Sequence, residues 1–438
     1  MKLRLYAWVL ALGLCLGCSD DAEPTQAHVG GAAGSGGSSS GGTSGSGGGG
    51  AGGAAGSGGV AGATGDFATF QDILLGKLDA KTGTSKIAAH DGFPVQTPDG
   101  FLFVHVDDGQ GPYALVGDHN GWQPTAMKAE AGLYWVVSAI QSPDGVKYKF
   151  QSSAPEPLAD PLSRRFGYDS FGEFSWVRES PAHLERWFDV GGSGIASRTL
   201  RIRVPAGTAT HHLYVHDGQN LFDPNGAFGS WKLDEAAGPA TLLVGIDNAG
   251  GARMDEYTHV EDVISGQKTG GNADAYADYV HDVVRPFIET RYGMPQKRGV
   301  MGSSLGGLVS FHEVLRHPGA WDYAASLSGT FGWGSIGAKN ETLIARFAAA
   351  PKGSTKLYLD SGGGPGSGCV DSDADGTDDD SPDAEDNYCE TLQLRDVLAG
   401  KGYAFDQDLW HWWEPSAPHN EAAWAARVFR PLQHFEAL

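Results

Sequence analysis

The chain has 438 residues, which is more than one ordinary hydrophobic core accommodates and enough for two domains with additional segments. It carries 31 Lys and Arg against 53 Asp and Glu, so its formal net charge is −22. A surface with this charge repels nucleic acid and anionic lipid, and neither is expected as a partner.

The N-terminus resembles an export signal. Two basic residues precede an apolar run over residues 5–16, which is too short for a permanent membrane helix. The run ends in LCLGC, where Gly17 and Cys18 resemble the lipobox of bacterial lipoproteins, with Cys15 in place of the usual Leu. We therefore expect residues 1–18 to comprise a signal peptide and an acylated Cys18 that anchors an exported protein to the outer membrane or cell surface. The alternative is a plain secretory signal and a secreted protein.

Residues 19–65 are expected to form a disordered tether. From about residue 29 onward this stretch is almost wholly Gly, Ala and Ser, which cannot bury a core. As a random coil it holds the folded part on the order of 30–40 Å from the membrane. Two cysteines lie beyond the signal region, Cys369 and Cys389, and in an exported chain they most simply form a disulfide.

Residues 66–180 are expected to form a small β domain. Short strand-like runs such as FLFVHV, YALV, YWVVSA and VKYKF are separated by turn clusters, a spacing typical of a sandwich. The stretch LVGDHNGWQP resembles early-set immunoglobulin-like domains, which include glycogen-binding carbohydrate modules. This resemblance implies that Trp122 stacks on sugar and that Lys149 hydrogen-bonds it, although APEPLADP lacks the second stacking Trp of that family. The alternative is a structural domain that shapes the cleft of an enzyme.

Residues 181–438 change to alternating strands and helices. Strands are expected at TLRIRV, LYVH, LLVGI, RGVM, YAASL, LYL and LWHW, and an amphipathic helix is expected over residues 273–292. This alternation predicts a mostly parallel sheet covered by helices on both faces.

The segment GSSLG, residues 302–306, fits the pattern G-x-S-x-G with Ser304 at its centre. It lies between the strand RGVM and an apolar helix that ends near Pro318, the context of a nucleophile elbow. Ser303 is one residue away from the nucleophile position and is expected to be a turn residue. A serine nucleophile requires a base, usually a histidine. In α/β-hydrolases the catalytic residues follow the order Ser, acid, His along the chain, and His419 fits this order because it lies in a loop between the last strand and the last helix. The alternative role of His419 is to flank a helix cap.

Several blocks in the C-terminal half resemble one esterase family. They are YVHDGQNLFD, VGIDNAGGARMDEYT, GVMGSSLGGLVSFHEVLRHPGAW, LYLDSG and HNEAAWAARVFRPL. The family includes enterochelin esterases, feruloyl esterases and mycolyltransferases and has an α/β-hydrolase fold. The resemblance implies that Ser304 is the nucleophile and His419 the base. It also implies an acid from the pair Glu385–Asp386, of which we choose Asp386, with Glu385 second and Asp360 as a further candidate.

The same resemblance implies the remaining parts of the site. The oxyanion hole would use the backbone amides of Leu305 and Gln219. The residues expected to line the cleft and bind substrate are Asp255, Glu256 and Tyr257.

The insertion DSDADGTDDD resembles the first nine positions of calcium loops of the EF-hand or thrombospondin type-3 kind. Its candidate ligands are Asp371, Asp373, Asp375 and Asp379. Position twelve is Pro382 in place of the bidentate Glu, and Asp383 is a substitute. A structural calcium ion beside the cleft is therefore expected, with no cofactor for catalysis, and a solvated acidic insertion is the alternative.

The sequence thus predicts an α/β protein: an α/β-hydrolase domain preceded by a small immunoglobulin-like β-sandwich. We expect a monomeric, extracytoplasmic serine esterase that acts on feruloyl or acetyl esters of carbohydrates and contacts the membrane only through its lipid anchor. One alternative is a siderophore trilactone esterase of the enterochelin type. An alternative of another class is a non-catalytic, glycan-binding lipoprotein.

Overall fold

The computed structural model of the protein describes residues 65–192, 194–378 and 386–438. The expected signal peptide, Cys18 and almost all of the tether lie outside these ranges, as do Asp379 and Glu385. Within them, no helix combines the length and the apolar character that crossing a membrane requires.

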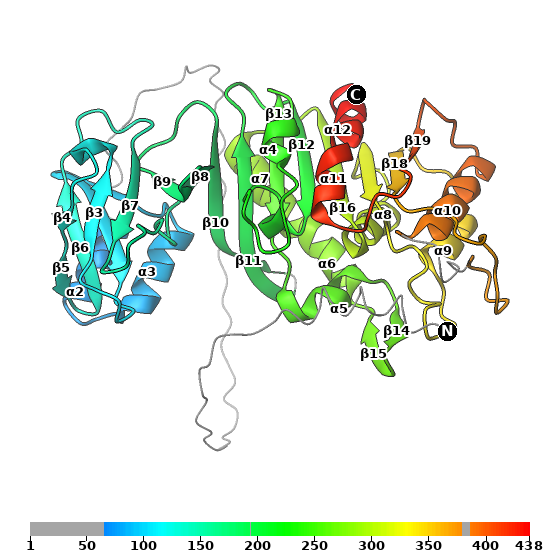
Figure 1. The fold of residues 1–438 in the computed structure, drawn as a ribbon, viewed down its shortest axis with the longest axis horizontal. Coiled ribbons are helices and arrows are strands. Elements are labelled where there is room, and N and C mark those ends of the chain that lie inside the picture. Colours follow the sequence, from blue (N-terminus) through cyan, green and yellow to red (C-terminus); the bar gives the residue numbers. More distant parts are fainter. Residues whose placement is uncertain (1–64, 193, 379–385) are drawn as a thin grey trace, which may run out of the picture.

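A long sheet runs through the molecule (Figure 1). One of the seven strands expected in the C-terminal half, TLRIRV, lies in its antiparallel part, and its parallel part carries the other six. Along the sheet these strands follow the order β19-β18-β17-β16-β12-β13. Because β13 and β16 flank β12 on opposite sides, the strand order reverses at β12, and ligands of such sheets bind outside the carboxyl ends of the strands at that point. The six strands are β12 (His211–His216), β13 (Thr241–Ile246), β16 (Lys297–Ser303), β17 (Tyr323–Leu327), β18 (Lys356–Ser361) and β19 (Leu409–Trp413).

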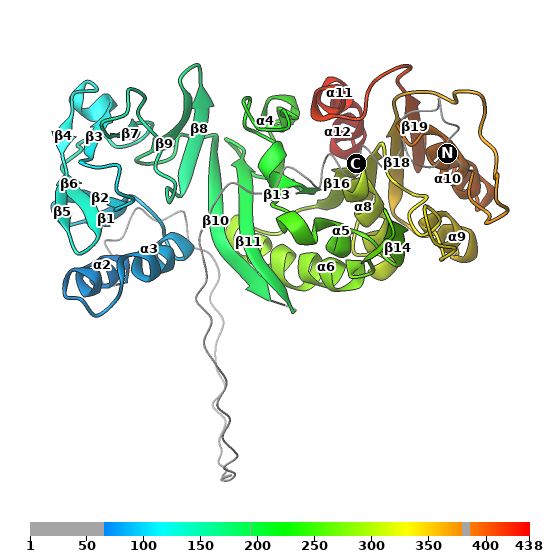
Figure 2. The same ribbon diagram turned by 60° about the horizontal axis from the view of Figure 1, so that its bottom comes forward.

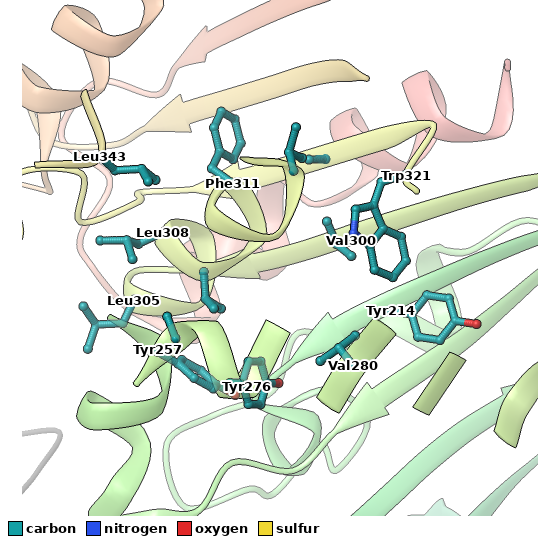
Figure 3. Close-up of a cluster of buried hydrophobic side chains, with 14 of the residues drawn as sticks. Tyr214, Tyr257, Tyr276, Val280, Val300, Leu305, Leu308, Phe311, Trp321 and Leu343 are labelled. Atoms are coloured by element: carbon teal, nitrogen blue, oxygen red, sulfur yellow. The ribbon is translucent and has the colours of Figure 1, made fainter. Parts of the chain in front are cut away.

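Helices cover both faces of this sheet, as Figure 2 shows. Successive strand residues point to opposite faces, so Tyr214 joins one apolar cluster while Leu213 and Val215 join the other. Figure 3 shows part of the first cluster, which includes Leu308 and Phe311 of the helix after Ser304 and Val300 of β16. The prediction of an α/β fold with a mostly parallel sheet is confirmed. The first face is covered by α5 (Arg253–Tyr257), α6 (Ala273–Tyr279), α7 (Arg285–Tyr292), α8 (Leu305–Arg316), α9 (Leu343–Ala349) and α10 (Tyr388–Gly400), and the second by α4 (Leu233–Ala236), α11 (Glu421–Arg427) and α12 (Phe429–Glu436).

The helix expected over residues 273–292 consists of α6 and α7, which a π-helical segment, Val280–Val284, joins without a break. Its predicted apolar face is buried against the sheet, since Tyr276, Val280 and Ile288 are fully buried.

Antiparallel strands continue the long sheet into the N-terminal part of the chain. Beyond β13 the order is β11-β10-β8-β9-β7-β3-β4, and a separate four-stranded sheet has the order β1-β2-β6-β5. The two sheets enclose an apolar cluster to which Phe103, Tyr148 and Phe150 contribute. The bounds of the long-sheet strands are β3 (Ala114–Gly117), β4 (Thr125–Ala126), β7 (Lys147–Gln151), β8 (Arg165–Asp169), β9 (Gly172–Trp176), β10 (His183–Gly192) and β11 (Ile195–Val204). Those of the smaller sheet are β1 (Val95–Thr97), β2 (Gly100–Val106), β5 (Lys128–Glu130) and β6 (Leu133–Ser138), and a hairpin of β14 (Glu261–Ile264) and β15 (Gln267–Gly270) lies apart.

Two helices precede these strands, α2 (Asp66–Leu74) and α3 (Ala80–Ala89), where the sequence reading expected only a β domain. The two helices bury the outer face of β2, which is apolar on both faces and would otherwise expose apolar side chains to water. Phe70 and Ile87 of the helices pack in one cluster with Leu102 and Val104 of β2. The relation of this region to early-set immunoglobulin-like domains stays a prediction.

Candidate active site

Ser304 lies at the tight turn between β16 and α8. Its backbone has φ 55° and ψ −125°, a conformation that an L-residue adopts only under strain. The turn requires glycine at Gly302, because a Cβ atom there would lie 2.5 Å from the backbone of Gly306. The Ser304 N–H donates to the carbonyl of Leu327 at 3.0 Å, which ties the turn to the neighbouring strand β17. The hydroxyl therefore stands at the carboxyl end of β16 and at the N-terminus of α8, where a nucleophile elbow places it.

His419 and Asp386 come together although 33 positions separate them in the chain. His419 lies between β19 and α11, and its Nδ1 is 2.6 Å from Asp386 Oδ1. The Asp386 side chain is fully buried, and that of His419 is 16 % exposed. A carboxylate bonded to Nδ1 leaves Nε2 of a neutral imidazole free to accept a proton.

The second oxygen of Asp386 is held by a network that the sequence did not reveal. Oδ2 accepts hydrogen bonds from the Ser328 hydroxyl at 2.7 Å and from the Gly362 N–H. The Arg427 guanidinium lies 3.5 Å from the same oxygen and donates to Ser328 at 2.6 Å. These donors fix the carboxylate and compensate for its desolvation.

Asp360, the other described candidate for the acid, has a different partner. Its Oδ1 accepts from Arg427 Nε at 3.0 Å, and its Oδ2 accepts from the Tyr358 hydroxyl at 3.0 Å. Burial raises the pKa of Asp360 to about 6 although Arg427 lowers it. The structure thus places Asp386, and not Asp360, against His419, while Glu385 lies outside the described residues.

Thr330 and Asn387 link the serine to the acid. Ser304 Oγ lies 3.4 Å from the Thr330 hydroxyl, and Asn387 Nδ2 donates to that hydroxyl at 3.1 Å. Asn387 follows Asp386 directly, and both adopt positive φ angles. The contact with Thr330 is long, and hydrogen bonds at active sites commonly tighten when substrate binds.

The two expected oxyanion donors lie on adjacent elements. Leu305 is the first residue of α8, so its N–H has no partner within the helix. Gln219 lies in the turn after β12, and Asn248 N–H donates to its side chain at 3.1 Å. The turn reaches the elbow, because a Cβ atom on Gly306 would lie 3.3 Å from Asp217 Oδ2.

A buried ion pair holds the turn that carries Gln219, and sequence analysis missed it. Asp217 adopts φ 59° and accepts two hydrogen bonds from Arg253, at 2.7 and 2.8 Å. Asn248 adds a third bond at 2.7 Å. Burial raises the pKa of Asp217, but Arg253 and Asn248 outweigh it and hold the pKa below its ordinary value. The only hint in the sequence was the presence of Asp217 and Arg253 in two of the family-like blocks.

The three residues expected to bind substrate occupy different positions. Asp255 is exposed, and its carboxylate accepts from Gly270 N–H at 2.7 Å. Glu256 is buried and pairs with Arg198 at 3.0 and 3.1 Å, and Tyr257 is fully buried. Glu256 and Tyr257 are therefore buried beneath the surface in this conformation. The expectation that these two residues line the cleft is corrected accordingly.

The two predicted sugar-binding residues also differ in exposure. Trp122 is 40 % exposed, and its indole donates to Asp118 at 2.9 Å. Lys149 is buried, and its ammonium donates to the carbonyl of Phe171 at 2.7 Å. Lys149 thus has an internal partner in place of the predicted sugar hydroxyl, and glycan binding stays a prediction that rests on Trp122.

The acidic insertion contains a disulfide and a cluster of carboxylates. Cys369 and Cys389 are bonded, which confirms the predicted pairing. Asp371, Asp373 and Asp375 bring one carboxylate oxygen each to within 4.8 Å of one another. That spacing and the all-oxygen donor set suit calcium, whereas Asp379 lies outside the described residues. Calcium at this loop therefore stays a prediction.

A cavity of about 700 Å³ lies elsewhere, lined by residues such as Arg164, Arg178 and Trp187. The Arg164 guanidinium there is already bonded to the carbonyls of Ala88 and His90 at 2.8 Å. None of the predicted catalytic residues lines this cavity.

The chain matches a family model described as "Putative esterase" over residues 196–434. A curated relative, the uncharacterized protein YbbA of Bacillus subtilis, is 27 % identical over 156 residues, which are 34 % of this chain and 60 % of that protein. The chain thus spans about 60 % of the length of the curated relative it matches.

Solved structures to which the chain is similar include an IroE-like serine hydrolase from Shewanella oneidensis, with TM-score 0.44, 17 % identity and coverage of 58 % of this chain and 80 % of that one. They also include the enterobactin esterase of Shigella flexneri, with TM-score 0.42, 14 % identity and coverage of 77 % and 93 %. A third is MPT51 of Mycobacterium tuberculosis, with TM-score 0.40, 14 % identity and coverage of 58 % and 98 %.

The fold is mixed α/β, with a mostly parallel sheet that carries the predicted site and helices on both of its faces. The chain belongs to the esterase family, as its motifs predicted.

Proposed function

We propose that the protein is an extracytoplasmic serine esterase in which Ser304 is the nucleophile, His419 the general base and Asp386 the acid. The observation that carries the proposal is the 2.6 Å contact between His419 and Asp386, made by residues from two separate loops. The strained backbone of Ser304 between Gly302 and Gly306 supports the assignment of the nucleophile.

The reaction proceeds through an acyl-enzyme. His419 Nε2 takes the proton of Ser304 while Oγ attacks the carbonyl carbon of the ester. The tetrahedral oxyanion is stabilised by the backbone N–H groups of Leu305 and Gln219. The intermediate collapses, and the alcohol leaves with the proton from His419. His419 then takes a proton from a water molecule whose oxygen attacks the acyl carbon, and it returns that proton to Ser304 Oγ as the acid is released. Asp386 holds the imidazole in position and stabilises its charged form.

For the substrate, we propose feruloyl or acetyl esters of carbohydrates. Two aromatic side chains flank the acid and the base: Tyr388 follows Asp386 by two positions, and Trp413 ends β19 ahead of the loop with His419. Their rings pack edge to face at 5.2 Å, and Trp413 is 38 % exposed. Such rings stack on planar acyl groups and on the apolar faces of sugars.

A siderophore trilactone is the alternative substrate, and the charge of the protein argues against it. A ferric catecholate complex is strongly anionic, whereas the chain has a net charge of −22 and carries its acidic insertion immediately before Asp386. The alternative of another class, a non-catalytic glycan-binding lipoprotein, is supported by the exposed Trp122. It does not explain why the His419–Asp386 pair and the elbow are both present.

The proposed location is outside the cytoplasm, by way of a lipid anchor at Cys18. The Cys369–Cys389 disulfide supports it, because disulfides persist in oxidising compartments. Labelling cells with a radioactive fatty acid tests the anchor, since a Cys18→Ala variant should lose the label that the wild type carries.

Hydrolysis by the purified full chain of methyl ferulate, an acetylated xylan and a ferric catecholate trilactone tests the function. We expect turnover of the first two, with Ser304→Ala inactive on all three. Turnover of the trilactone alone would establish the siderophore alternative. Glycan retention without turnover, unchanged in Ser304→Ala, would establish the binding protein.

A further inference from the structure

A carboxyl group and an imidazole face each other in the core behind the elbow. Glu313 lies on α8, two turns beyond Gly306, and His216 ends β12. Both side chains are 0 % exposed, and Glu313 Oε1 lies 3.6 Å from His216 Nε2. Within the described part of the chain, neither oxygen of Glu313 nor Nε2 of His216 has a hydrogen-bond partner.

Burial disfavours the charged form of both groups. Burial raises the pKa of the Glu313 carboxyl well above its ordinary value and lowers the pKa of His216 to about 3. A protonated carboxyl is a donor, and Nε2 of a neutral imidazole with its proton on Nδ1 is an acceptor. A small approach from 3.6 Å therefore gives an O–H···N hydrogen bond that satisfies both groups.

The His216 imidazole also contacts the first of two neighbouring tyrosines, Tyr276 and Tyr257. His216 Nδ1 lies 2.9 Å from the Tyr276 hydroxyl. Tyr276 and Tyr257 lie side by side, with ring centroids 5.0 Å apart (Figure 3). The Tyr257 hydroxyl in turn accepts a hydrogen bond from the backbone N–H of Asp217 at 3.2 Å.

Asp217 is the residue whose left-handed backbone starts the turn that carries Gln219. Its side chain is held from one side by Arg253, and its N–H is held from the core by Tyr257. The buried groups thus form one connected path from α8 to the proposed oxyanion donor.

We propose that Glu313 is a positioning residue for the oxyanion hole: its carboxylic acid holds His216, and through Tyr276 and Tyr257 it fixes the backbone of Asp217 ahead of Gln219. The inference rests on the proposed role of Gln219. A leucine of similar size would fill the same space without the cost of burying a carboxyl, so packing alone does not account for the acid at this position.

The test compares Glu313→Gln with Glu313→Leu in the full chain. The amide of Gln can still donate to His216 Nε2, whereas Leu leaves that nitrogen without a partner. His312→Gln is the matched control, because His312 is the preceding residue on α8, is 2 % exposed and bonds Asp274 instead of the path to Asp217.

We expect Glu313→Leu to lower kcat by about tenfold or more with KM nearly unchanged, since an oxyanion contact acts in the transition state. Glu313→Gln should stay within about threefold of the wild type, and His312→Gln should do the same. Equal kcat in Glu313→Leu and wild type, or a loss in KM alone, would overturn the proposal. So would a loss in Glu313→Gln as large as in Glu313→Leu.

Amide hydrogen exchange provides a readout that does not depend on turnover. The segment from Asp217 to Asn220 should exchange faster in Glu313→Leu than in the wild type, with Glu313→Gln and His312→Gln unchanged. Unchanged exchange of this segment in Glu313→Leu would refute the path. If Ser304→Ala were as active as the wild type while this exchange pattern held, the proposed function would fail and the path would stand.

Discussion

Asp386→Asn should remove most of the turnover while the protein stays folded. The carboxylate is fully buried and touches His419 Nδ1 at 2.6 Å. Because Ser328 and the Gly362 N–H donate at the Oδ2 position, the amide oxygen of Asn takes that position and the NH₂ faces His419 Nδ1. The NH₂ favours the wrong tautomer and does not stabilise the charged form of the imidazole. Loss of this role costs about 10⁴-fold in kcat for a Ser-His-Asp triad, or about 5 kcal/mol in the transition state.

Asp360→Asn is the matched control for this prediction. Asp360 is equally buried and bonds the same Arg427 at 3.0 Å, but it does not contact His419. We expect its kcat to stay within about tenfold of the wild type, a loss of less than about 1.4 kcal/mol. Steady-state hydrolysis of p-nitrophenyl acetate, measured on samples whose circular dichroism shows equal folding, checks both variants. A larger loss in Asp360→Asn than in Asp386→Asn would refute the assignment of the acid.

Three further changes test other parts of the account. Gly302→Ala should abolish hydrolysis, because its Cβ would meet the backbone of Gly306 at 2.5 Å and displace the elbow; turnover equal to wild type would contradict this. Calcium should raise the melting temperature of the wild type more than that of Asp373→Asn, whereas an equal response would indicate no ion among the three carboxylates. Burial raises the pKa of Asp360 from 3.8 to about 6, so its contribution to the free energy of unfolding is complete below pH 3.8 and is lost as the pH rises through 6. Denaturant titrations of wild type and Asp360→Asn should differ in pH slope over that window by on the order of 3 kcal/mol in total, and parallel curves would contradict the shift.

Much of the fold follows from local patterns in the sequence. The seven strands expected in the C-terminal half all occur, because apolar runs between turn residues need no distant information to be recognised. The elbow was equally visible, since glycines around Ser304 are a local requirement of the backbone. Helices α2 and α3 were missed because they cover the outer face of β2, and no motif in the helices signals that contact.

The site was predictable only in part, because the residues that hold the catalytic side chains in place come from distant segments of the chain. Arg427 contacts Asp386 and Ser328, which lie 41 and 99 residues away in the sequence, and no motif predicts these contacts. Family-like blocks pointed to Glu256 and Tyr257 as a part of the site, but they could not tell a lining residue from a buried support. Exposure depends on what packs over a side chain, and that is a property of the whole fold.

The measurement that tests the central claim most directly is covalent labelling with a fluorophosphonate, followed by peptide mass spectrometry. We predict one adduct per molecule, on Ser304, with hydrolysis lost in proportion to labelling. Ser303→Ala should still be labelled and Ser304→Ala should not. An adduct on another residue, or hydrolysis that survives in Ser304→Ala, would contradict the account.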